Sequence, residues 1–334
     1  MRELTYAQAI NEALHQLMEQ DERVFLIGQG VTSPWYVGTT TVGLIDRFGE
    51  RRVIDTPVSE NGITGIAAGA AIAGMRPIVV HPRMDFMYYA MDQIANHIAN
   101  WHFMLGGKVS VPLVIWGIIN RGGEQAAQHS QALQAIFTHI PGCKVLTPSN
   151  PYDAKGLLIS AVMDEDPVIY VDDRWLYTQR GEVPEEVYSV PLGRGMLLRE
   201  GNHVTLVAIS YMVTEALKAA EMLLDEGIDA EVIDPRSLKP LDTELIFESV
   251  RKTGRLVIAD GGWRTCGIAA EIAALVSEHL FNFLKAPVKR VTLPDAPAPA
   301  STALERVYYP TARDIIRSVK EIMEKDKSVS NSLR

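Results

Sequence analysis

A series of short apolar runs that alternate with segments of helical periodicity limits the possible folds more than any other feature of the sequence. Each run is bounded by turn residues, which is typical of buried strands. Strands that alternate with helices predict a mainly parallel sheet covered by helices on both faces. In the first half of the chain these runs are residues 24–27, 78–80, 111–116, 144–146 and 168–171.

Residues 172–195 interrupt the alternation. They are charged and include Pro184, Pro191 and three glycines, a composition typical of a connector between domains. Beyond them the alternation resumes, with apolar runs at 204–209, 230–233, 256–259 and 288–293. The sequence therefore predicts an α/β protein of two domains, each a mainly parallel sheet flanked by helices. We expect the first domain at residues 1–185, with the connector from about residue 172, the second at 196–325, and a polar tail at 326–334.

Length, charge and cysteine content narrow the classes of function. A chain of 334 residues is long enough for two domains with substantial cores. Its formal net charge of −9 argues against nucleic acid or an anionic membrane as the main partner. Cys143 and Cys266 lack metal-binding spacing, the first residues do not form a signal peptide, and no apolar run reaches the roughly 18 residues of a membrane span. We expect a soluble cytoplasmic protein.

One segment places a single acid at the start of a helix made of small residues. In the string VIDTPVSENGITGIAAGAAIAG, residues 53–74, Glu60 precedes a run dominated by glycine and alanine. Each glycine inside a helix costs roughly 1 kcal/mol relative to alanine. The composition therefore predicts a buried helix that another backbone approaches closely. Taken alone, Glu60 is most simply an acid that offsets the dipole of its helix.

The common catalytic motifs are absent, but one loop carries a candidate group. The sequence has no P-loop, no H-E-x-x-H and no G-x-S-x-G, and Gly28-Gln29-Gly30 lacks the third glycine of a dinucleotide motif. A polar loop at residues 117–131 follows a strong apolar strand and contains His129. Because ligands bind beyond the carboxyl ends of parallel strands, Glu60 and His129 are predicted to face one crevice. Without that context, His129 is more simply a loop histidine bonded to backbone.

Several long blocks resemble the β subunit of the thiamine-diphosphate-dependent 2-oxo acid dehydrogenases, the decarboxylating component. The resemblance runs from about residue 4 to residue 320 in one order and without large gaps. The blocks that carry it are VIDTPVSENGITGIAAGAAIAGMRPIV, MDQIANHIA, QHSQALQAIFTHIPGCKVLTPSNPYDAKGLL, IDPRSLKPLD, ADGGWRTCGIAAEI and LPDAPAPASTALE.

The resemblance implies roles for three residues. Glu60 would contact N1′ of the aminopyrimidine of thiamine diphosphate, Phe86 would pack against that ring, and His129 would line the entrance and help acyl transfer. Without the resemblance, Phe86 would be read as an ordinary core aromatic. Burial can raise the pKa of a carboxyl by up to roughly 3–5 units, more than a helix N-terminus lowers it. We therefore expect Glu60 to share a proton with the ring nitrogen, which prepares the cofactor to act as electron sink.

The resemblance also implies partners. No G-D-G string, which in the superfamily helps to hold the diphosphate and Mg²⁺, occurs in the sequence. A separate α subunit would therefore carry that half of the site in an α2β2 assembly, and a lipoyl acyltransferase core would accept the acyl group. Ala161, Asp164 and Asp166 fall where some relatives bind a potassium ion.

Two stretches depart from the family pattern. Relatives have acids after the first strand, close to the cofactor, where this chain has Gln29 and Gly30. Before Asp85 the chain reads His81-Pro82-Arg83-Met84 instead of an acidic and aromatic string. We hypothesise that His81 or Arg83 adapts the substrate pocket to an anionic or phosphorylated group. A surface arginine at a strand end explains Arg83 about as well.

Two other readings remain open from the sequence. The chain could belong to a two-chain transketolase-like enzyme that transfers ketol or acyl units without a lipoyl partner, which the departures would suit. It could also be a non-catalytic scaffold, although the presence of Glu60, Phe86 and His129 together argues against this. The sequence does not identify the 2-oxo acid, the acceptor or the oligomeric state of the isolated chain.

Overall fold

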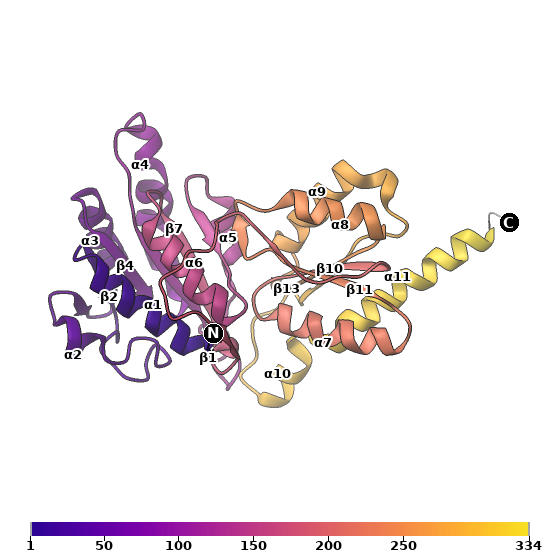
Figure 1. The fold of residues 1–334 in the computed structure, drawn as a ribbon, viewed down its shortest axis with the longest axis horizontal. Coiled ribbons are helices and arrows are strands. Elements are labelled where there is room, and N and C mark those ends of the chain that lie inside the picture. The colour runs from indigo at the N-terminus through magenta and orange to yellow at the C-terminus, as the bar shows by residue number, and fades with distance from the viewer. Residues whose placement is uncertain (1, 333–334) are drawn as a thin grey trace. The chain divides into compact units, whose positions relative to one another are not determined.

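The computed structural model describes residues 2–332, with side chains described up to Glu324. The chain forms two compact units (Figure 1). Unit 1 comprises Met1–Leu192 with Leu238–Pro240, and unit 2 comprises Gly193–Ser237 with Leu241–Arg334. Residues 333 and 334 of the predicted tail lie outside the described residues.

Unit 1 is built on a seven-stranded sheet with the strand order β12-β6-β7-β5-β4-β2-β3. Strands β2 to β7 pair in parallel, and their interior positions are almost entirely apolar and buried, which confirms the predicted parallel sheet. The run predicted at 111–116 becomes a strand three residues later. The strands are β2 (Val24–Gly28), β3 (Val53–Asp55), β4 (Arg76–His81), β5 (Val114–Ile119), β6 (Lys144–Leu146), β7 (Val168–Asp173) and β12 (Ser237–Lys239).

Helices and a small two-stranded sheet complete unit 1. Thr5 caps the first helix in a capping box with Gln8, and this helix packs against α6, whose N-terminus is capped by Asn150. The helices are α1 (Tyr6–Gln20), α2 (Leu44–Phe48), α3 (Glu60–Ile72), α4 (Ala99–Met104), α5 (Gln134–His139) and α6 (Pro151–Met163), with the tighter or wider turns η1 (Met84–Ala90), η2 (Asp92–Ile98) and η3 (Arg174–Leu176).

The stretch predicted as a connector begins inside the sheet. Asp172 and Asp173 are completely buried and form the last two positions of β7. Further on, β8 (Arg180–Val183) pairs antiparallel with β1 (Arg2–Thr5). The charges and prolines of this stretch predicted a connector, but Asp172 and Asp173 are buried because they have partners within the fold. The change from unit 1 to unit 2 falls between residues 192 and 193.

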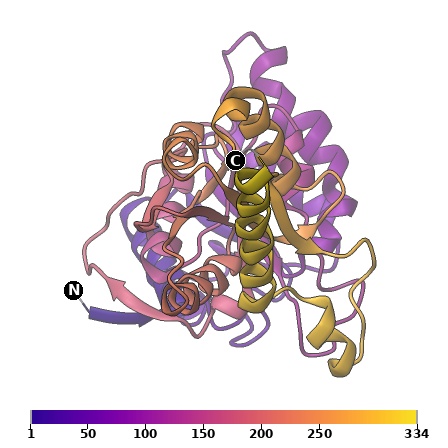
Figure 2. The ribbon, with the colours of Figure 1, turned by 90° about the vertical axis from the view of Figure 1, so that its right-hand side faces the viewer.

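Unit 2 contains a five-stranded sheet with the order β14-β13-β10-β11-β9. All pairs are parallel except that of β9 with β11. Helices α7 and α11 pack against each other and with apolar side chains of the sheet form one core, in which α11 lies against β13 and β14 (Figure 2). The elements are β9 (Met196–Arg199), β10 (Val204–Ala208), β11 (Ala230–Asp234), β13 (Leu256–Trp263), β14 (Lys289–Leu293), α7 (Met212–Asp225), α8 (Thr243–Thr253), α9 (Ile268–Leu280), η4 (Phe281–Phe283), α10 (Thr302–Tyr308) and α11 (Ala312–Ser332).

The fold is therefore the predicted one, two mainly parallel sheets flanked by helices. Helix α11 continues to Ser332, so residues 326–332 of the polar tail extend the last helix. No helix among the described residues is long and apolar enough to cross a membrane.

Candidate active site

Polar side chains gather where the parallel strands of unit 1 end. Strands β7, β5, β4, β2 and β3 are consecutive in the sheet, so the segments that follow them lie along one edge. In α/β sheets this carboxyl edge is where ligands bind. We call it the carboxyl edge. It carries Gln29 after β2, Arg83, Asp85 and Phe86 after β4, Arg121 after β5 and Arg174 after β7, and Glu60 begins the helix that follows β3.

Glu60 is the first residue of α3, directly after Ser59, whose side chain does not cap the helix. Its backbone carbonyl accepts a hydrogen bond from Thr64 Oγ1 at 2.7 Å, which fixes the first turn. The Glu60 side chain is half-buried, and within residues 2–324 its carboxylate has neither a hydrogen bond nor an ion pair. A charge near helix N-terminal amides is stabilised without consuming its acceptor oxygens, so this carboxylate remains available to a ligand.

The helix that begins with Glu60 is not fully buried as predicted. It packs on β4, η1 and η2, and a Cβ added to Gly65 would lie 3.2 Å from Gln93 Oε1. In contrast, a Cβ on Gly69 would meet nothing within 4 Å, and Ile66 is 62% exposed. Only one face of the helix has the close neighbour that its composition predicts. The other face of small and apolar residues is open in the isolated chain, so this chain alone does not supply the burial of Glu60 that the sequence argument assumed.

Phe86 and His129 meet at the carboxyl edge. Their rings are perpendicular with centroids 5.4 Å apart, and both residues are half-buried. Buried Asp85, next to Phe86, accepts a hydrogen bond from the backbone amide of Gln131 at 3.1 Å. Burial raises the pKa of Asp85. The hydrogen bond from the Gln131 amide and the nearby His129 counteract part of this rise. The loop that carries His129 is thus held against the segment that carries Phe86.

Gln29 and Tyr36 form the next part of the edge. Gln29 Nε2 donates to Tyr36 Oη at 2.9 Å. Gly30 has a φ of 69°, and a Cβ there would lie 2.2 Å from the Tyr36 ring, so only glycine allows this ring position. The Asp55 carboxylate at the end of β3 accepts from the Gly30 amide at 2.8 Å and from Thr32 Oγ1. The Gln29 side-chain amide is therefore held in place by an aromatic hydroxyl.

The structure separates the two residues proposed for an adapted substrate pocket. His81 is buried, its Nε2 lies 3.1 Å from Thr64 Oγ1, and burial lowers its pKa to about 4. It is therefore neutral at physiological pH and holds α3 to β4, so the hypothesis that it binds an anion is not supported. Arg83 is half-buried, and its guanidinium carbon lies 5.7 Å from the centroid of the Tyr36 ring.

Sequence reasoning missed a buried polar cluster at the end of β7. Asp172 Oδ2 accepts from Trp116 Nε1 at 2.8 Å and from Tyr177 Oη at 3.0 Å. Burial raises the pKa of Asp172 to about 7, against the effect of these two donors. Asp173 forms an ion pair with Arg121 at 2.8 Å. The usable signal was the position of both acids directly after an apolar run, at the same edge as Glu60.

The sequence patterns of two families cover most of the chain. The family described as "Transketolase, pyrimidine binding domain" matches residues 2–179, and "Transketolase, C-terminal domain" matches residues 193–315. The chain belongs to this transketolase family. Its members are thiamine-diphosphate-dependent enzymes, and the β-subunit relatives described next place the chain among the β subunits of such enzymes.

Two relatives and one solved structure illustrate the similarity. The chain is 45% identical to the acetoin:2,6-dichlorophenolindophenol oxidoreductase subunit beta of Bacillus subtilis, over 96% of this chain and 98% of the relative. It is 42% identical to the pyruvate dehydrogenase E1 component subunit beta of Rickettsia felis, with the same coverage. The solved structure of a "Split gene transketolase, inactive beta4 tetramer" matches with a TM-score of 0.77 and 27% identity, over 97% of this chain and 99% of that one.

The carboxyl edge fits the pyrimidine half of the family's cofactor. It offers a carboxylate without a partner at Glu60 and a half-buried aromatic ring at Phe86, the two groups that an aminopyrimidine needs for a hydrogen bond and a stacking contact. Within residues 2–324, no three His, Cys, Asp or Glu side chains gather closely enough to hold a metal ion.

The three residues predicted near a potassium ion lie at the end of α6. Lys144 Nζ contacts both oxygens of the Asp164 carboxylate, at 2.8 and 2.7 Å, and lies 3.1 Å from Asp166 Oδ2. Arg76 Nη1 donates to the carbonyl oxygen of Asp164 at 3.0 Å. The two carboxylates thus share one ammonium group, and a potassium ion would compete with Lys144 for them or depend on backbone oxygens such as that of Ala161. This ion stays a prediction.

Proposed function

We propose that this chain is the β subunit of a heteromeric thiamine-diphosphate-dependent enzyme that decarboxylates a 2-oxo acid and passes the acyl group to a lipoyl acyltransferase. One observation carries the proposal. The unpartnered Glu60 carboxylate lies on the same carboxyl edge as the Phe86–His129 contact, and this edge belongs to a domain of the pyrimidine-binding family. The relatives named above include the β subunit of a pyruvate dehydrogenase E1 component.

In this proposal each of the three residues has a separate task. Glu60 Oε accepts a hydrogen bond from, and shares a proton with, N1′ of the aminopyrimidine. Phe86 fixes the plane of that ring by contact, and its edge-to-face contact holds His129 beside it. His129 donates a proton or a hydrogen bond to the acyl oxygen during transfer. When bound, thiamine diphosphate supplies the electron sink for decarboxylation.

The proposed partner is an α subunit that carries the diphosphate and Mg²⁺ half of the site, in an α2β2 assembly. Exposed apolar residues along and just before α3 support this part of the proposal, because Val58, Ile66 and Ile72 are 66%, 62% and 43% exposed. Apolar side chains in such numbers beside a candidate site mark a protein interface. A subunit seated there would also remove water from Glu60. We propose a cytoplasmic location for the assembly.

A second candidate is a two-chain transketolase-like enzyme that transfers ketol or acyl units without a lipoyl partner. The similarity to a split-gene transketolase structure favours it, as do Gln29 and Arg83 at positions where relatives differ. Both candidates use Glu60 and Phe86 in the same way. They differ in the donor and in the acceptor.

The test is to co-express the chain with the α-like subunit and to measure reduction of an artificial electron acceptor that depends on a 2-oxo acid. The panel contains pyruvate, branched-chain and phosphorylated 2-oxo acids, with thiamine diphosphate and Mg²⁺ present. Turnover that Glu60→Gln abolishes supports the first candidate and identifies the substrate class. A stable complex that binds the cofactor but turns over no 2-oxo acid, and instead transfers a ketol unit to an aldehyde, supports the second. If such a complex shows neither activity, both candidate functions are contradicted.

A further inference from the structure

We propose that Arg83 and Arg174, which both contact Tyr36, form a subsite for a phosphate group on the substrate, away from the reacting carbonyl. The inference rests on the proposed function, since it adds a substrate class to the same carboxyl edge. Arg83 follows β4 and Arg174 follows β7, so the two arginines come from separate strands of the one sheet.

Tyr36 connects the two guanidinium groups. The Arg83 guanidinium lies over the Tyr36 ring, with its carbon 5.7 Å from the centroid. Arg174 Nη2 donates to the backbone carbonyl of Tyr36. Tyr36 itself is held by Gln29 and by close approach to Gly30. The loop after β2 thus contacts both Arg83 and Arg174, which are far apart in the sequence.

Both arginines have donors to spare. Arg83 uses Nη1 for the carbonyl of Pro82 at 2.8 Å, and Arg174 uses Nη2 for Tyr36. The Nε atoms of both are buried and have no hydrogen-bond partner in the described part of the chain. Neither arginine forms an ion pair with any residue from 2 to 324. Buried donors without partners are costly, so such groups require an explanation, and a bound ligand is one.

The acids nearby each have a partner, although Asp85 Oδ2 and Asp172 Oδ1 are buried without a hydrogen bond in the described residues. Asp172 accepts from Trp116 and Tyr177, Asp173 pairs with Arg121, and Asp85 accepts from the Gln131 amide. Burial lowers the pKa of Arg83, the charge of Arg174 lowers it further, and the Asp85 carboxylate offsets part of this, so the two cations repel each other. An anion bound by the Nη atoms of both arginines would offset that repulsion.

A phosphate fits these two groups better than a carboxylate does. Two guanidinium groups carry two positive charges and several donors in planar forks, which match the charge and the oxygens of a phosphate ester. Pyruvate and the plain branched-chain 2-oxo acids have no second anion for this subsite. The natural substrate is therefore a phosphorylated 2-oxo acid or ketol.

The first test measures binding without turnover. Inorganic phosphate is titrated by calorimetry into the co-expressed complex saturated with thiamine diphosphate, with acetate as a monoanion for comparison. We expect phosphate to bind, and Arg83→Met and Arg174→Met each to weaken it by about tenfold or more, the worth of one charge-assisted contact. Arg83→Lys keeps the charge but loses the planar guanidinium, so its phosphate affinity should lie between those of wild type and Arg83→Met. Arg180→Met is the matched control because Arg180 forms only an exposed pair with Glu3.

The second test compares hydroxypyruvate with its 3-phosphate in the same complexes. The ratio of their kcat/KM values should favour the phosphate ester in wild type and fall about tenfold in each methionine variant. No phosphate binding by wild type, or the same affinity in all variants, overturns the subsite. A loss of thiamine diphosphate affinity at unchanged phosphate affinity also overturns it. Phosphate binding that depends on both arginines, in a complex that turns over no 2-oxo acid, keeps the subsite and rejects the decarboxylase proposal.

Discussion

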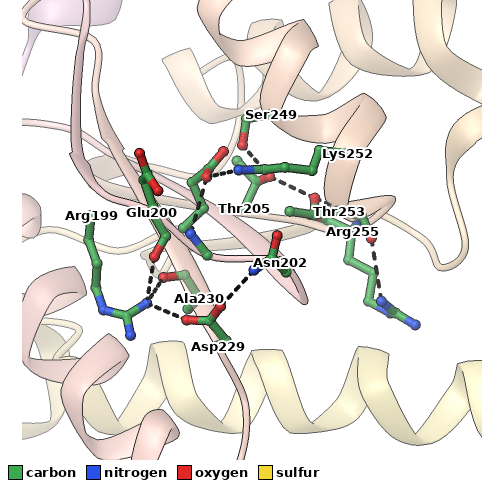
Figure 3. Close-up of polar contacts among 12 residues, drawn as sticks. Arg199, Glu200, Asn202, Thr205, Asp229, Ala230, Ser249, Lys252, Thr253 and Arg255 are labelled. Atoms are coloured by element: carbon green, nitrogen blue, oxygen red, sulfur yellow. Dashed lines mark hydrogen bonds and ion pairs between the residues drawn. The ribbon is translucent and has the colours of Figure 1, made fainter.

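The two sheets of this protein carry polar clusters at opposite ends of their strands, and the clusters differ in how their charges are paired. In unit 2 the cluster lies at the amino ends of β10, β11 and β13 (Figure 3). There Asp229 accepts from Arg199 at 3.0 Å, and buried Glu231 contacts Lys252. In unit 1 the carboxyl edge leaves Glu60, Arg83 and Arg174 without an ion pair in the described residues. Charges paired within the fold serve stability, and charges left open at a ligand-binding edge serve function.

The unit 2 cluster also contains a chain of buried hydroxyl groups. Thr205 Oγ1 lies 2.7 Å from Ser249 Oγ and 2.8 Å from Thr253 Oγ1, so strand β10 and helix α8 share a buried hydroxyl chain. The Gly201 amide donates to Glu231 at 3.2 Å. These contacts join the start of β10 to α8, and the loop before β10 to the start of β11. Substitutions in this cluster are expected to lower stability and leave activity unchanged. Substitutions of Glu60, Arg83 or Arg174 at the carboxyl edge are expected to lower activity and leave stability nearly unchanged.

The largest expected effect is that of Glu60→Gln on turnover. The amide cannot share a proton with N1′, and loss of such a group typically lowers kcat by about 10²- to 10⁴-fold. The free energy of unfolding of the complex without cofactor should change by less than about 1 kcal/mol, because the carboxylate has no partner within residues 2–324 and loses only the effect of its helix N-terminus. Dye-linked turnover and thermal unfolding of the same preparation measure both. Full activity in the variant would contradict the role given to Glu60.

Lys252→Met should cost stability and leave kcat unchanged. It leaves the Glu231 carboxylate, 3% exposed, with only the Gly201 amide as donor. Because Lys252 itself is 43% exposed, water replaces part of the lost contact, and we expect about 2 kcal/mol in the free energy of unfolding. Urea titration checks this. Lys289→Met, which breaks an exposed pair with Glu321, is the control and should cost less than about 0.5 kcal/mol.

Asp172→Asn should flatten the pH dependence of stability. Burial raises the folded pKa of Asp172 to about 7, from an ordinary value of 3.8. Between these values the folded state holds a proton that the unfolded state has released, so this group's contribution to stability falls as pH rises from about 4 to 7. In the asparagine variant we expect the loss of unfolding free energy between pH 5 and pH 8 to be smaller by about 1–2 kcal/mol.

The comparison for this third prediction is the slope and not the absolute stability, since asparagine changes the hydrogen bonds of Trp116 and Tyr177. Burial raises the pKa values of Asp85 and Asp173 as well, so part of the pH dependence should remain. Denaturant titrations at several pH values measure the slope. An identical slope in wild type and variant would show that Asp172 stays ionised in the fold.

The smallest effect is expected for Arg180→Met. Arg180 and Glu3 are 56% and 57% exposed at 3.1 Å, in the pairing of β8 with β1. An exposed pair of this kind contributes about 0–0.5 kcal/mol, less than either polar cluster. A change above 1 kcal/mol in urea titration would mean that charge pairing at the surface matters as much as in the clusters. It would remove the basis of the comparison.

The sequence predicted the fold from local chemistry. The apolar runs of β2, β4 and β7 follow from periodicity alone. Glu60, Phe86 and His129 came from family resemblance, and their roles stay predictions. Tyr36 and Arg174 could not be found in this way, because they meet only after β2 and β7 take their places in the sheet. The neutral state of His81 could not be predicted from the sequence either, because its pKa depends on burial that no local pattern reveals.

The most direct test of the central claim is the shift in thermal unfolding midpoint that thiamine diphosphate causes in the co-expressed complex, compared between wild type and Glu60→Gln. A ligand that binds only the folded state raises the midpoint in proportion to its affinity. We predict nearly equal midpoints without cofactor and a clearly smaller shift in the variant. A lowered midpoint without cofactor, together with an unchanged shift, would show that Glu60 supports the fold and does not hold the cofactor.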